Sequence, residues 1–180
     1  MLYAILADGF EEIEAIVFID ILKRAGVDIK TVSVNDSKIV TGAHGIPLVA
    51  DLVIAETKSD DVDGIFLPGG MPGTTNLMNS KALCNMIIDL NNKKKYLIAI
   101  CAAPMIFGEL KLLQNKKATC YPSFEKHLIG ADVCEDEVCI ADNIFTSRGA
   151  GTAHELAFAF VECVKGKEFS EQLRKNMQYK

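Results

Sequence analysis

YLIAICAAP, residues 96–104, is the stretch that decides the fold. Residues 96–100 form a short, continuous apolar run, which is typical of a strand buried in a parallel sheet. The chain then turns at Cys101 directly into a helix, because Pro104 suits the first helical turn and the small Ala102 and Ala103 permit a sharp bend. This order predicts a strand, a tight turn and a helix, which is the repeating unit of an α/β protein.

The same alternation of strands and helices extends outward in both directions. Gly26 is expected to end the first helix, and the last strand is followed by a long helix and a shorter one. We expect strands at 2–7, 27–34, 62–67, 95–100, 118–120 and 143–149, helices at 11–26, 77–90, 152–164 and 170–177 and directly after Cys101, and a hairpin at 131–140. Short connections between such elements predict a doubly wound parallel sheet with helices on both faces, in one domain that covers residues 1–180.

Composition excludes several classes of function. The 180 residues are 49% hydrophobic and 24% charged, which is ordinary for a globular protein. A net charge of -5 lacks the basic surface that neutralises phosphates, so we expect no nucleic-acid partner. The sequence has no signal peptide and no apolar run of the ~18 residues that cross a membrane. We therefore expect a cytoplasmic protein without a membrane partner.

Six cysteines are present, and we expect them to be free thiols in a reducing compartment. Cys134 and Cys139 could approach each other across the expected hairpin, but a reducing cytoplasm argues against a stable bond. None of the cysteines has the CxxC spacing of a metal site, so no metal is expected.

Cys101 differs from the other cysteines because it leaves a strand and faces the start of a helix. Backbone N–H groups there favour an anion, so we expect its thiolate to be stabilised. From this motif alone, a buried cysteine that acts as a small hydrophobe is an equal alternative. The LPGG turn at 67–70 can bring amides close to an oxyanion, or is simply a tight turn. Glu14 is a candidate proton donor, whereas Glu11 and Glu12 are expected to be solvated.

Four motifs occur in order along the chain: DGFEEIEA at 8–15, FLPGGMPG at 66–73, AICAAP at 99–104 and TSRGAGTAHELA at 146–157. Together they resemble the ThiJ/PfpI superfamily, in the branch of the Parkinsonism-associated deglycase and its bacterial relatives. The resemblance implies a flavodoxin-like three-layer α/β sandwich with a mainly parallel sheet, a homodimer, and neither a metal nor an organic cofactor. It also implies that Cys101 is the nucleophile and Glu14 its protonated partner, with the backbone N–H groups of Gly70 and Ala102 as the anion-binding pair.

Two departures from the family pattern concern the chemistry. The branch often has a histidine before the proline of the segment that reads ATCYPSF here, so Tyr121 stands in its place. A phenol cannot serve as a base near neutral pH without a large fall in its pKa. The protease-like members resemble a cysteine followed by histidine, whereas Ala102 follows Cys101, which argues against peptidase activity. Tyr121 and His154 are possible auxiliary residues, and His44 and His127 are further candidates for a replacement base.

The leading hypothesis is therefore an enzyme of the glyoxalase or deglycase type, in which Cys101 adds to a small dicarbonyl such as methylglyoxal or to its adducts. The alternative is a redox sensor or oxidative-stress chaperone that uses the same cysteine without turnover. A role in thiamine metabolism is a third, weaker interpretation. We also expect a homodimer, because Ile13, Val17 and Phe18 give the first helix more apolar surface than one buried face needs.

Overall fold

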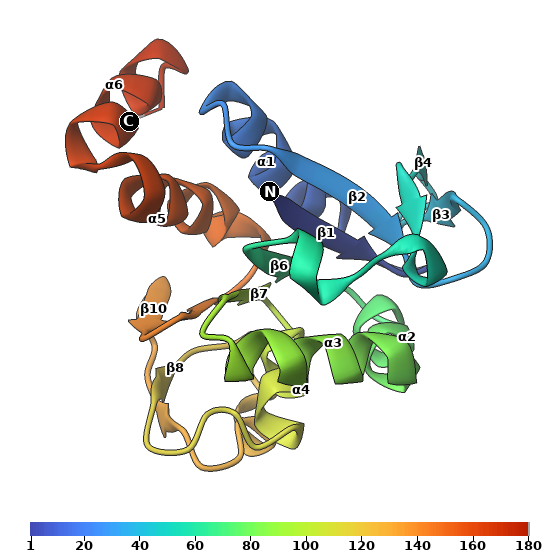
Figure 1. The fold of residues 1–180 in the computed structure, drawn as a ribbon. Helices are drawn as coiled ribbons and strands as arrows, with labels where there is room; N and C mark the ends of the chain where they lie inside the picture. The colour runs from blue at the N-terminus through green and yellow to red at the C-terminus, as the bar shows by residue number, and fades with distance from the viewer. Residues whose placement is uncertain (180) are drawn as a thin grey trace.

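The computed structural model, which describes residues 1–179, is built on a seven-stranded sheet in the order β10-β11-β7-β6-β1-β2-β5 (Figure 1). All neighbouring strands are parallel except β10, which runs antiparallel to β11 at one edge. The strands are β1 (Leu2–Leu6), β2 (Ile29–Ser33), β5 (Leu52–Val53), β6 (Gly64–Leu67), β7 (Tyr96–Ile100), β10 (Val138–Ala141) and β11 (Ile144–Ser147). The predicted α/β sandwich with a mainly parallel sheet is confirmed.

Helices cover both faces of this sheet. One face carries α1 (Glu12–Arg24), α5 (Ala153–Lys165) and α6 (Lys167–Asn176), and the other carries α2 (Gly73–Asn79), α3 (Lys81–Asn92) and α4 (Pro104–Glu109). Successive residues of β1 point to opposite faces of the sheet. Leu2 and Ala4 pack with α1 and α5 on one face, whereas Tyr3 and Ile5 pack with α3 on the other. Both faces are buried, which explains why the central strands read as continuous apolar runs.

Two small sheets and several short turns complete the chain. The hairpin β3 (Ile39–Thr41) and β4 (Pro47–Val49) is antiparallel, whereas β8 (Lys117–Ala118) and β9 (Asp132–Val133) pair in parallel. Short 3₁₀ segments lie at Ile54–Glu56, Ser59–Asp61, Glu125–His127 and Ala150–Thr152. Among the helices within residues 1–179, none has the length and apolar character needed to cross a bilayer.

Two sequence predictions were wrong in detail. The helix expected at 77–90 is divided at Ser80, whose hydroxyl accepts a hydrogen bond from the backbone N–H of Leu83 and so begins a new helix. The hairpin expected at 131–140 does not form, because β9 pairs with β8 and β10 pairs with β11. The chain between β9 and β10 therefore crosses from the small β8–β9 sheet to the edge of the seven-stranded sheet.

Candidate active site

Cys101 lies at the carboxyl end of β7, in the turn that leads to α4. Its φ of 63° is in the left-handed region, which a residue with a side chain adopts only when its surroundings hold it there. Its backbone N–H donates to the carbonyl of Ser147 at 2.9 Å, and its carbonyl accepts from the N–H of Tyr121 at 2.8 Å. Two neighbouring segments therefore fix this backbone, in the manner of a nucleophile elbow.

Glu14 approaches Cys101 from the first turn of α1. Its side chain is buried, with the residue 1% exposed, and Oε2 accepts a hydrogen bond of 2.7 Å from the backbone N–H of Gly69. The other oxygen, Oε1, is buried without a hydrogen-bond partner among the described residues. A carboxyl group with one oxygen held and the other free, beside a thiol, is arranged to exchange a proton with that thiol.

The glycines of the LPGG turn are required for this close approach. A Cβ placed on Gly69 would lie 2.5 Å from Cys101 Cβ and 2.9 Å from Glu14 Oε2. Gly70 has φ +87°, and a Cβ there would lie 2.5 Å from the backbone nitrogen of Glu11. Gly70 was identified from the sequence as a site residue and Gly69 was not, although Gly69 belongs to the same LPGG motif.

The thiol and the carboxyl shift each other's ionisation. Burial raises the pKa of Glu14 to about 7, against the hydrogen bond from Gly69 and the interaction with Cys101. Burial, followed by the negative charge of Glu14, raises the pKa of the Cys101 thiol to about 12. The amides of Gly70 and Ala102 act in the opposite direction, as expected for an anion-binding pair, but they do not outweigh burial.

Burial and the charge of Glu14 therefore oppose the stabilisation of the thiolate that the backbone N–H groups at the helix start supply. A thiolate at Cys101 needs Glu14 to carry its proton, because two negative charges side by side in a buried site are strongly unfavourable. The pair holds one proton between them over a wide pH range, and that proton lies on one group or the other. The ionisation of Cys101 therefore has to be treated together with that of Glu14.

The structure brings Tyr121 close to Cys101 and leaves the three histidines elsewhere. The backbone of Tyr121 bonds to Cys101, while its side chain is 50% exposed. The ring of His154 stacks on Tyr179 with centroids 4.8 Å apart. The other two imidazoles are each bonded to a glutamate, as His44 to Glu12 and His127 to Glu109, both at 2.8 Å. No hydrogen bond among the described residues joins His154 to Cys101, and its auxiliary role stays a prediction.

Glu12 is not the solvated carboxylate that the sequence predicted. It is 7% exposed and holds the loop after β3, accepting hydrogen bonds from the backbone N–H groups of His44 and Ile46 and from the His44 ring. These hydrogen bonds outweigh burial and lower the pKa of Glu12. Glu11, Glu12 and His44 bring ligand atoms within 4.8 Å of one another, but Glu12 is already occupied by protein donors.

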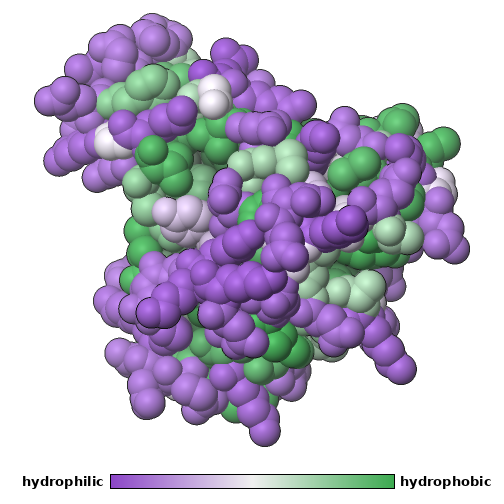
Figure 2. All heavy atoms as spheres, in the orientation of Figure 1, coloured by the Kyte–Doolittle hydropathy of each residue, from purple (hydrophilic) through white to green (hydrophobic). Residues whose placement is uncertain are grey.

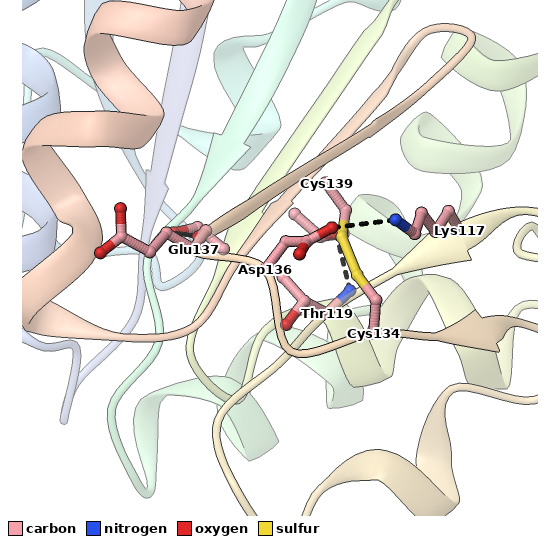
Figure 3. The surroundings of a disulfide bond; sticks show 8 residues. Lys117, Thr119, Cys134, Asp136, Glu137 and Cys139 are labelled. Atoms are coloured by element: carbon pink, nitrogen blue, oxygen red, sulfur yellow. Dashed lines mark hydrogen bonds and ion pairs between the residues drawn. A yellow bond between two sulfur atoms is a disulfide. The ribbon is translucent and has the colours of Figure 1, made fainter.

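Cys134 and Cys139 form a disulfide bond, so the expectation that all the cysteines are free thiols was wrong (Figure 3). The two cysteines approach each other as the sequence allowed, but not across a hairpin: Cys134 follows β9, Cys139 lies in β10, and the chain between them crosses from one sheet to the other. Asp136 lies within 4.8 Å of both sulfurs, and its carboxylate pairs with Lys117 at 2.9 Å. Cys84, Cys101, Cys120 and Cys163 are free.

Comparison with known proteins agrees with this architecture. Residues 2–163 match the DJ-1/PfpI family. The protein DJ-1 homolog B of Arabidopsis thaliana is 42% identical over 165 residues, which are 91% of this chain and 38% of that protein, so the chain spans less than half of that relative. The glutathione-independent glyoxalase DJR-1.2 of Caenorhabditis elegans is 30% identical over 167 residues, covering 92% of this chain and 88% of that protein.

A solved structure shows the same fold. The oxidised DJ-1 of Toxoplasma gondii superposes with a TM-score of 0.94 at 34% identity, covering 99% of this chain and 97% of that one. The resemblance expected from the four sequence motifs is therefore confirmed for nearly the whole chain.

Proposed function

Because the chain belongs to the DJ-1/PfpI family, we propose that it is a cysteine-dependent enzyme of the glyoxalase or deglycase type, acting on small dicarbonyls or their adducts. The observation that carries this proposal is the buried pair of Cys101 and Glu14, in which one carboxyl oxygen is free beside a thiol held in a strained turn. A relative named as a glutathione-independent glyoxalase supports the same class of reaction.

For methylglyoxal the proposed reaction adds one water and yields lactate. The Cys101 sulfur bonds to the aldehyde carbon while Glu14 gives its proton to the carbonyl oxygen, forming a hemithioacetal. The Glu14 carboxylate then takes the proton from that carbon and returns it to the neighbouring carbon, while the hydroxyl proton on the first carbon moves to the oxygen of the second, which leaves a thioester. Water cleaves the thioester, releasing the hydroxy acid and restoring the thiol. These proton transfers require no cofactor, and the Gly70 and Ala102 amides stabilise developing negative charge.

We also propose that the chain is a homodimer through α1 and the β3–β4 hairpin. Of the apolar residues expected to leave extra surface on α1, Ile13 is 54% exposed, whereas Phe18 is fully buried in the core. Ile16 on α1 and Ile46 and Val49 on the hairpin are also 47–72% exposed. Figure 2 shows apolar surface at the hairpin end of the molecule, and Glu12 bonds the hairpin loop to the start of α1. A second copy would cover this apolar surface.

Turnover of methylglyoxal by purified protein, followed as lactate formation, tests the enzymatic proposal. We expect many turnovers per Cys101 thiol, their loss in Cys101→Ser, and unchanged turnover in Cys163→Ser, which removes an exposed thiol elsewhere. Consumption of one dicarbonyl per thiol, without lactate, would refute the enzyme and favour the redox sensor. Full activity in Cys101→Ser would instead remove the proposed nucleophile.

A further inference from the structure

We propose that Cys134 and Cys139 are a second redox site, separate from Cys101, which an external disulfide such as oxidised glutathione converts from two thiols into one bond. The bond joins the two segments that hold the Cys101 backbone, so its formation tightens the candidate active site. Its effect on turnover rests on the proposed function, but its formation and its effect on the backbone do not.

The first segment runs from Cys134 to the carbonyl of Cys101. The backbone N–H of Cys134 donates to the carbonyl of Ala118 at 2.9 Å, which extends the pairing of β9 with β8. Three residues beyond Ala118 the chain reaches Tyr121, whose N–H donates to the Cys101 carbonyl at 2.8 Å. Cys134 thus anchors the strand that supports one side of the nucleophile's backbone.

The second segment runs from Cys139 to the N–H of Cys101. Cys139 pairs with Thr146 in β11, and the next residue, Ser147, accepts the backbone N–H of Cys101 at 2.9 Å. The Ser147 hydroxyl also donates to the carbonyl of Glu137 at 2.7 Å, inside the loop that the disulfide closes. Each of the two hydrogen bonds that fix the Cys101 backbone therefore has its second partner on a segment that this disulfide joins to the other.

The two segments touch directly as well. The N–H of Thr119, which follows β8, donates to the hydroxyl oxygen of Thr146 in β11 at 3.0 Å. Lys117 of β8 pairs with Asp136 in the loop at 2.9 Å, beside the sulfurs (Figure 3). With the disulfide reduced, these two contacts and the Lys116–Asp142 ion pair would still provide a connection between the segments. Because Lys117 and Asp136 are both exposed, their pair adds little to it.

The exposure of the two sulfurs sets the order of the chemistry. Cys134 is partly exposed, whereas Cys139 is 3% exposed. An external disulfide RSSR therefore reacts first with the Cys134 thiolate, forming a mixed disulfide and releasing one RSH. The Cys139 thiolate then attacks the Cys134 sulfur and releases the second RSH. Two protein thiols are oxidised and one external disulfide is reduced to two thiols, and the reverse reaction restores the starting state.

The test compares the wild-type protein in its two redox states. After equilibration in glutathione buffers of different poise, peptide mass mapping reports the Cys134–Cys139 bond, and hydrogen exchange reports the amides of Cys101 and Tyr121 in molecules whose Cys101 is unmodified. We expect these two amides to exchange faster after reduction, by at most ~30-fold, which is the limit set by closing a loop with a sequence separation of 5.

Two variants separate this effect from general reduction. Cys134→Ser with Cys139→Ser should give fast exchange in every buffer, whereas Cys84→Ser should respond as the wild type does, because Cys84 lies in α3 away from both segments. Equal exchange of the Cys101 amide with and without the bond would overturn the proposal, as would a pair that never oxidises. Neither readout needs catalysis, so absence of methylglyoxal turnover would count against the proposed function only.

Discussion

Replacing Glu14 by glutamine should stabilise the folded protein at neutral and alkaline pH while damaging its chemistry. The amide has nearly the shape of the carboxyl, and its oxygen can still accept the Gly69 N–H that now donates at 2.7 Å. What the substitution removes is the ionisation of a group that is 1% exposed. An ionised carboxyl in such a site is unfavourable, so the native protein carries a stability cost at its candidate active site.

The magnitude follows from the shift in pKa. Burial raises the pKa of Glu14 from 4.5 to about 7, so the folded state holds a proton that the unfolded state releases within this range. Stability therefore falls as pH rises from 4.5 to about 7, by about 3 kcal/mol in total. Glu14→Gln does not titrate, so its stability relative to wild type should rise by this amount across the same window.

Urea denaturation of both proteins below pH 4.5 and above pH 7 measures the difference. Glu168→Gln, at an exposed position on α6, is the matched control and should show no such pH-dependent gain. The reasoning fails if Glu14→Gln gains nothing over wild type above pH 7, because Glu14 would then ionise in the folded protein as easily as in water. The variant should also lose turnover, since an amide cannot shuttle the proton.

Three further substitutions test other parts of the site. Gly69→Ala should cost about 1–3 kcal/mol of stability in urea denaturation and abolish turnover, because its Cβ would lie 2.5 Å from that of Cys101; normal stability and activity would contradict the close approach. Ile16→Lys, at a residue 47% exposed on α1, should convert the proposed dimer to a folded monomer in sedimentation, and a wild-type monomer at micromolar concentration would refute the proposed interface. Tyr121→His should raise kcat for methylglyoxal by ~10-fold if an imidazole beside the nucleophile assists proton transfer, whereas equal kcat values would show that Glu14 suffices.

The sequence by itself determined the layers of the fold and the candidate reacting groups. The continuous apolar runs at β1, β6 and β7 can be satisfied only by a sheet covered on both faces, so the three layers follow from hydrophobic pattern alone. Cys101 and the LPGG turn stand at strand ends, and strand ends in a parallel sheet meet at one edge. Motif order along the chain then connected Glu14 to them.

Tertiary structure alone decided how these groups behave and how the short strands beside the disulfide pair. The pKa of Glu14 depends on the water that the LPGG turn excludes, and no local pattern records the proximity of residues 14 and 69. The chain between Cys134 and Cys139 crosses from one sheet to another because β9 pairs with β8 and not with β10, and strands as short as two residues carry too little pattern to specify a partner. Ionisation and strand pairing are set by neighbours distant in sequence, and these neighbours come together only when the chain folds.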